Sequence, residues 1–121
     1  MYPQVHFENC IEEHNFSHRF GDRGGVHIAA ALRNNKTLVR LDLLGNQFGS
    51  NTASKLSQAL PENSTLTSIN LMKNMFNNED GAILEAALKK NQTILEFLIQ
   101  DNPIDVGLIS RISRVSNVPL F

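Results

Sequence analysis

Histidine and cysteine side chains lie four residues apart near the start of the chain, at His6, Cys10, His14 and His18. On a helix this spacing would place them along one face, and both residue types are zinc ligands. A helix from His6 to His18 would span ~18 Å, so one ion could reach only a neighbouring pair, which is short of a closed tetrahedral site. The sequence therefore predicts no metal centre, and we interpret these histidines as capping and loop residues.

Two further features bear on chemistry. Cys10 is the only cysteine, and His6 and His14 are near it in sequence, but no motif around them indicates a nucleophile with a positioned base. The glycine-rich segment GDRGG, residues 21–25, precedes a predicted helix, whose N-terminus could bind phosphate. Its spacing matches neither the Walker nor the dinucleotide-binding pattern, so we interpret it as a loop that enters the helix. We predict no catalytic residues and no cofactor.

A set of apolar residues and asparagines recurs along the chain at a fixed interval of 28 residues. The first half of the recurring unit is Leu38, Leu41, Leu43, Asn46 and Phe48, then Leu66, Ile69, Leu71, Asn74 and Phe76, then Ile94, Phe97, Ile99, Asn102 and Ile104. The second half is Ile28, Ala31, Leu32 and Asn35, then Leu56, Ala59, Leu60 and Asn63, then Leu84, Ala87, Leu88 and Asn91. Because many positions recur in register, the chain is predicted to repeat one structural unit.

The two halves of the unit have different hydrophobic periods. In LVRLDLL, TLTSINL and ILEFLI the apolar residues alternate, which predicts a strand with one buried face. In VHIAAAL, ASKLSQAL and GAILEAAL they are three and four apart, which predicts an amphipathic helix. Asn46, Asn74 and Asn102 follow the strands, and we expect them to form a ladder of hydrogen bonds. Stacked units would make the continuous core that one unit cannot make alone.

The pattern LxxLxLxxNxF, followed by a helix, resembles the leucine-rich repeat in its ribonuclease-inhibitor-like subtype. Three units match, from about Gly24 to Ile112. The resemblance implies an α/β solenoid of about four units, with a parallel β-sheet on the concave side and α-helices on the convex side. The whole chain, 1–121, is then one domain, with an irregular N-terminal unit 1–37 and repeats 38–65, 66–93 and 94–121.

Both ends depart from the pattern. In the first unit His14 takes the place of the ladder asparagine, and the loop before the helix is about four residues longer. At the other end, DVGLISRISRV predicts a last helix with Leu108, Ile109 and Ile112 as its apolar stripe, and we expect the tail SNVPLF to cover it. Neither end has an obvious polar cap, so a homodimer through the open repeat ends is an alternative.

Strand residues between the buried positions are predicted to face solvent in three columns. The first column is Arg40, Ser68 and Glu96, the second is Asp42, Asn70 and Leu98, and the third is Leu44, Met72 and Gln100. Adjacent strands lie ~4.8 Å apart, so Leu44, Met72 and Leu98 should form one apolar area inside a charged rim, as interaction sites do. The family resemblance implies protein binding through this concave face. The alternative is a solvated sheet whose apolar residues are covered by the tail.

Composition limits the classes of function. The net charge is −1 and the basic residues are scattered, which is not the pattern of a nucleic-acid binder. No apolar stretch approaches the ~20 residues that span a bilayer, the N-terminus has no secretory signal, and there is one cysteine, so we expect a cytoplasmic protein. Three of the four glycosylation triplets, at Asn35, Asn63 and Asn91, share one repeat position, and we interpret these asparagines as left-handed helix ends.

We therefore predict a non-catalytic module that binds another protein through the sheet face. Three alternatives stay open at this point. They are a self-assembling scaffold or regulatory subunit, a secreted effector or immune-recognition protein, and an activator of an enzyme, since some relatives of the resembled subtype stimulate GTP hydrolysis. The sequence does not indicate which protein would be the partner.

Overall fold

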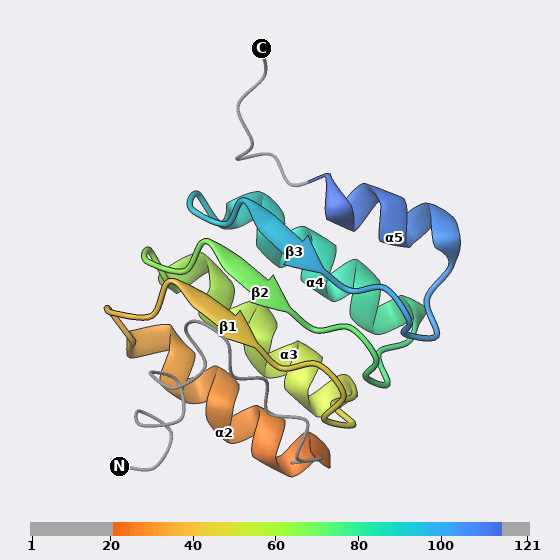
Figure 1. Ribbon diagram of the computed structural model, residues 1–121, viewed down its shortest axis with the longest axis horizontal. Helices are drawn as coiled ribbons and strands as arrows, with labels where there is room; N and C mark the ends of the chain where they lie inside the picture. The colour runs from red at the N-terminus through yellow and green to blue at the C-terminus, as the bar shows by residue number, and fades with distance from the viewer. Residues whose placement is uncertain (1–20, 115–121) are drawn as a thin grey trace.

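The computed structural model describes residues 21–114, in which helices and strands alternate (Figure 1). The elements are α2 (Gly21–Asn34), β1 (Arg40–Asp42), α3 (Ser50–Ala59), the short 3-10 helix η1 (Leu60–Glu62), β2 (Ser68–Asn70), α4 (Asn78–Lys90), β3 (Glu96–Leu98) and α5 (Val106–Ser113). The strands form one parallel sheet in the order β1-β2-β3, and α2, α3 and α4 lie behind one of its faces. None of the helices in this part of the chain is both long and apolar enough to cross a membrane.

The register of the sheet follows the interval of 28 residues seen in the sequence. Leu41 of β1 pairs with Ile69 of β2, which pairs with Phe97 of β3. After β1 and after β2, a helix returns the chain to the start of the next strand, as parallel pairing requires. The order of strands in space is therefore their order in the chain.

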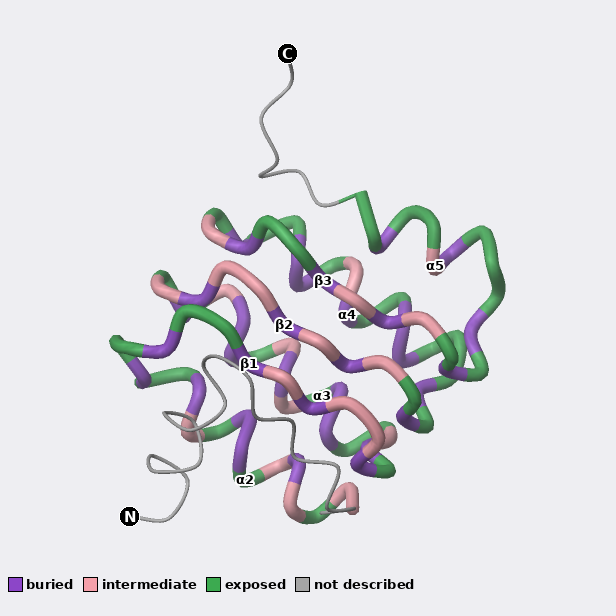
Figure 2. The backbone as a smooth tube through the Cα atoms, in the orientation of Figure 1, coloured by how far each residue is buried: buried purple, intermediate pink, exposed green. Residues whose placement is uncertain are grey.

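The core lies between the sheet and the helices. Figure 2 shows buried positions alternating with less buried ones along the strands, and recurring on one side of each helix. Phe48, Phe76 and Phe97 are the largest fully buried side chains, and each comes from a different strand–helix unit, which we call a layer. Burial of a leucine or phenylalanine side chain contributes about 1.5–3 kcal/mol, so this apolar core supplies most of the stability of the domain.

The asparagines that follow the strands form the expected ladder, through bonds from side chain to backbone. The Asn74 side-chain oxygen accepts the N–H groups of Asn46 and Phe48 at 2.9 and 3.0 Å, and its amide donates to the Leu43 carbonyl at 3.2 Å. Asn102 repeats the arrangement one layer later, accepting the Phe76 N–H at 3.0 Å. Each of these side chains therefore joins its own layer to the preceding one.

A second ladder is made by the asparagines that follow the helices. The Asn63 amide donates to the carbonyls of Leu32 and Asn35 at 2.8 and 3.1 Å, and its oxygen accepts the N–H groups of Thr65 and Leu66. The interpretation of these positions as left-handed helix ends is wrong, because Asn63 has φ −90° and ψ 130°, which is extended backbone.

Asn91 has the same role, since its amide donates to the carbonyls of Leu60 and Asn63. Asn63 and Asn91 are 3% and 2% exposed. In each side chain the amide nitrogen donates and the oxygen accepts hydrogen bonds within the fold, and this structural role explains why asparagine recurs at these positions without a glycan.

Helices α2 and α3 make a close contact. The Asp22 carboxylate accepts the N–H groups of Gly49, Asn51 and Thr52 at 2.8–3.0 Å and the Thr52 hydroxyl at 2.6 Å, so a side chain of α2 caps the N-terminus of α3. A Cβ atom on Gly25 would overlap the Thr52 hydroxyl. The interpretation of residues 21–25 as a loop is wrong, because these residues form the first turns of α2.

The predicted solenoid of about four leucine-rich-repeat units is also wrong. Residues 21–114 form a small α/β domain with three strands of three residues each and four α-helices. The sequence pattern fixes how one strand–helix unit packs on the next, but it does not fix how many units the chain completes. The predicted first unit, with Cys10, His14 and the metal-ligand spacing, lies largely outside the described residues, and so does the C-terminal tail.

Candidate functional site

The face of the sheet opposite α2, α3 and α4, which no other element of residues 21–114 covers, brings together the nine residues of the three predicted columns. We call this surface the open face, and it consists of Arg40, Asp42, Leu44, Ser68, Asn70, Met72, Glu96, Leu98 and Gln100. The first two columns are paired directly by the register of the strands. The third column lies two residues beyond the strands, where the Gly45 N–H donates to the Met72 carbonyl at 3.0 Å and the Lys73 N–H to the Gln100 carbonyl at 3.2 Å.

The first column is polar. The Ser68 hydroxyl donates to Glu96 Oε1 at 2.8 Å, which fixes the carboxylate on β3. Arg40 is exposed at the other end of the column, on β1. The column therefore has a positive end and a negative end on the two outer strands, which could orient a partner with the opposite arrangement of charge.

The second column holds the backbone in place where the chain leaves the strands. Asp42 Oδ1 accepts the Leu44 N–H at 3.2 Å, and Asn70 Oδ1 accepts the Met72 N–H at 3.0 Å. These bonds fix the backbone that carries the Leu44 and Met72 side chains. Preorganised contact groups lose less conformational entropy on binding than mobile ones.

The apolar residues of the open face are half-buried rather than fully exposed, which applies to Leu44, Met72 and Leu98 alike. Larger exposed fractions occur one residue before the first column, at Val39 (44%) and Leu95 (48%). We call Val39, Thr67 and Leu95 the entry row, because they precede the three strands and are joined by backbone hydrogen bonds of 2.8 Å from Thr67 N–H to the Val39 carbonyl and from Leu95 N–H to the Thr67 carbonyl.

The entry row was missed in the sequence because Val39 and Leu95 directly follow buried residues, Leu38 and Ile94, and so resemble the start of a buried strand. The signal that could have found it is one of position, because residues 39, 67 and 95 are 28 apart, directly precede the first column and lie outside the alternating pattern. The entry row adds two exposed apolar side chains to the edge of the open face.

Acidic and metal-ligating groups do not converge in this part of the chain. Among residues 21–114, no three histidine, cysteine, aspartate or glutamate side chains are placed so that they could hold a metal ion. Burial raises the pKa of Asp22, but the Thr52 hydroxyl and the N–H groups of Gly49, Thr52 and Asn51 outweigh that effect and hold the pKa below its usual value. The resulting carboxylate is part of the contact between α2 and α3 and belongs to the fold.

Comparison with known proteins identifies a structural likeness and no family. No protein-family model matches the chain, and no curated protein sequence matches it. A solved structure described as leiomodin-1 actin-binding site 2 resembles it with a TM-score of 0.72 at 22% sequence identity, over 91% of this chain and 67% of that chain.

These comparisons correct the assignment to the leucine-rich-repeat family and its ribonuclease-inhibitor-like subtype. The fold that is supported is the small α/β domain of this actin-binding site. A repeated strand–helix pattern specifies how neighbouring layers pack, and the family name assigned from it was wrong. The likeness, at 22% identity, concerns the fold alone.

Proposed function

We propose that the chain is a non-catalytic protein-binding domain and that its partner docks on the open face. The observation that carries the proposal is the arrangement of that face, where Leu44, Met72 and Leu98 are grouped towards the ends of the strands and the charged residues Arg40 and Glu96 lie at their starts. Apolar contact residues next to polar and charged ones are the usual composition of a protein interface. Methionine suits such a surface because its side chain adapts to the shape of the partner.

Actin is the partner we propose to test first. The solved structure with this fold is described as an actin-binding site, and the likeness covers most of the chain. The open face is small, so an interface confined to it would lie at the low end of the usual range, below ~1,200 Å² in total. We therefore expect weak binding, with the entry row as a further contact.

The test compares three purified proteins for binding to monomeric actin and to actin filaments. The first is the wild type, the second is Leu44→Glu with Met72→Glu, and the third is Ile83→Glu with Val106→Glu. The third is the matched control, because it introduces the same charge at exposed apolar residues of α4 and α5, 42% and 80% exposed. Circular dichroism and urea unfolding establish that all three are folded.

We expect the open-face variant to bind actin roughly 30- to 700-fold more weakly than the wild type, since interface side chains of this kind contribute about 1–2 kcal/mol each and the variant changes two of them. The control should bind like the wild type. Equal binding by all three would exclude the open face, and loss in the control alone would place the site on the helices. A wild type that binds neither form of actin would exclude actin as the partner.

A further inference from the structure

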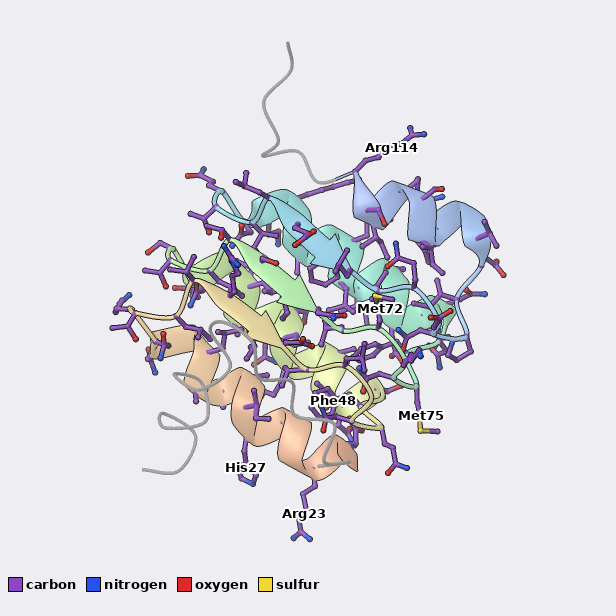
Figure 3. The ribbon with its side chains drawn as sticks, in the orientation of Figure 1. Arg23, His27, Phe48, Met72, Met75 and Arg114 are labelled. Carbon is purple, nitrogen blue, oxygen red and sulfur yellow. The ribbon has the colours of Figure 1, made fainter. Side chains whose placement is uncertain are left out.

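A groove runs between α2 and α3, on the helical side of the domain, and three of its lining residues are basic. It has a volume of about 420 Å³, and the basic residues are Arg23, His27 and Lys55. Figure 3 shows the Arg23 and His27 side chains projecting outward from α2. An adjoining groove shares Lys55 and Gln58 with the first and adds a further basic residue, Arg33, so the basic character continues along the contact between the two helices.

No acidic residue lines either groove. The one acidic residue of α2 and α3 is Asp22, and its carboxylate is bound to the N-terminus of α3 by hydrogen bonds from Gly49, Asn51 and Thr52. The whole chain has a net charge of −1, so the groove is a local concentration of positive charge. Within residues 21–114, Arg23 and Lys55 have no ion-pair partner.

The contact between α4 and α5 shows what the groove lacks. There Arg111 Nε donates to Glu85 Oε2 at 3.0 Å, which neutralises a cation between two neighbouring helices. Lys55 lies two intervals of 28 residues before Arg111, so the two cations occupy equivalent positions. The residue two intervals before Glu85 is Ala29. Lys55 therefore occupies the place of a paired cation, while the carboxylate that would pair with it is replaced by a methyl group.

We propose that this groove binds an acidic peptide segment of a partner protein, whose carboxylates contact Lys55 and Arg23. A carboxylate is the ligand that the equivalent cation Arg111 takes within the chain itself. The basic residues are also too few for a nucleic acid, which is bound through many phosphate contacts. This site is separate from the open face, because the helices that form it lie behind the opposite side of the sheet (Figure 1).

The experiment measures the binding of a short fluorescent polyglutamate peptide by anisotropy, at low and at physiological salt. The test variant is Arg23→Gln with Lys55→Gln. The matched control is Lys89→Gln with Lys90→Gln, which removes the same charge from exposed positions at the end of α4. A further variant, Ala30→Glu, places a carboxylate at an exposed residue of the adjoining groove, which Lys55 also lines, so that it should compete with the peptide for Lys55.

We expect the wild type and the lysine control to bind the peptide alike, and the test variant and Ala30→Glu to bind about tenfold more weakly. The difference should shrink at higher salt, because exposed charges are screened. Equal weakening in the lysine control would show an effect of net charge alone and overturn the proposal. So would a wild type that does not bind polyglutamate, or one that binds an oligonucleotide of equal charge more tightly through the same residues. The open-face variant Leu44→Glu with Met72→Glu should bind the peptide like the wild type, which separates this test from that of actin binding.

Discussion

Replacing Asn74 with alanine should destabilise the domain far more than replacing Asn70, the asparagine of β2, with alanine. The Asn74 side chain accepts two backbone N–H groups and donates to three carbonyls, those of Leu43, Leu71 and Met72, at 3.0–3.2 Å. Alanine can replace none of these bonds, and the residue is only 7% exposed, so water has little access to the groups that lose a partner. A buried polar group left without a partner costs about 1–3 kcal/mol, which gives a total loss of about 3–5 kcal/mol for the groups released together.

Urea unfolding followed by circular dichroism measures this loss as a shift of the midpoint at constant slope. Asn70→Ala is the matched control, because Asn70 lies on the open face, is half-buried and makes one bond, to the Met72 N–H at 3.0 Å. We expect the control to cost about 0.5–1.5 kcal/mol. If Asn74→Ala costs no more than Asn70→Ala, the ladder does not hold the layers together and the reasoning is refuted.

Two further predictions concern the contact between α2 and α3. Gly25→Ala should destabilise the domain by about 1–3 kcal/mol, because the added methyl group has no space against α3. Gly81→Ala should be close to neutral, since the atom nearest to its Cβ, at 3.0 Å, is the end of a flexible side chain. Equal urea midpoints for the two variants would contradict this prediction. The pKa of Asp22 is lower in the folded than in the unfolded protein. The Asp22 carboxylate therefore stabilises the fold at a pH above the pKa of the unfolded chain, and this stabilisation is lost as the pH falls below about 4. Wild type should thus lose more stability between about pH 6 and pH 3 than Asp22→Asn, and parallel losses in the two proteins would show that this carboxylate is not the group responsible.

The period of the sequence was enough to predict the local structure and the register. The alternation around Leu41 and Ile69 places both on the buried face, and their separation of 28 residues gives the pairing of β1 with β2. The same separation predicted that Asn46 and Asn74 would be linked. These features depend on residues that recur, and so the sequence contains them directly.

Other features depend on contacts between unlike residues, which no period reveals. The capping of α3 by Asp22 joins residues of two helices, and nothing in the order of the chain indicates that a carboxylate of one would reach the N-terminus of the next. Asn63 recurs in register, but its extended backbone and its bonds to the preceding layer follow from packing. Val39 and Leu95 lie just before β1 and β3, where the alternating pattern of the strands does not apply, so that pattern did not predict their exposed fractions.

Comparing the residue types at equivalent positions of the units distinguishes residues that stabilise the fold from residues whose type packing does not determine. The ladder position is asparagine in all three units, at 46, 74 and 102, and the Asn74 and Asn102 side chains each accept a backbone N–H of the preceding unit. The first column of the open face instead carries Arg40, Ser68 and Glu96, three unlike residues at equivalent places. Packing imposes no single residue type there, so the choice of side chain is available for recognition. The same argument applies to the helices, where Ala29 beside Lys55 takes the place that Glu85 has beside Arg111. Both proposed binding surfaces thus lie at equivalent positions whose residue types differ from unit to unit.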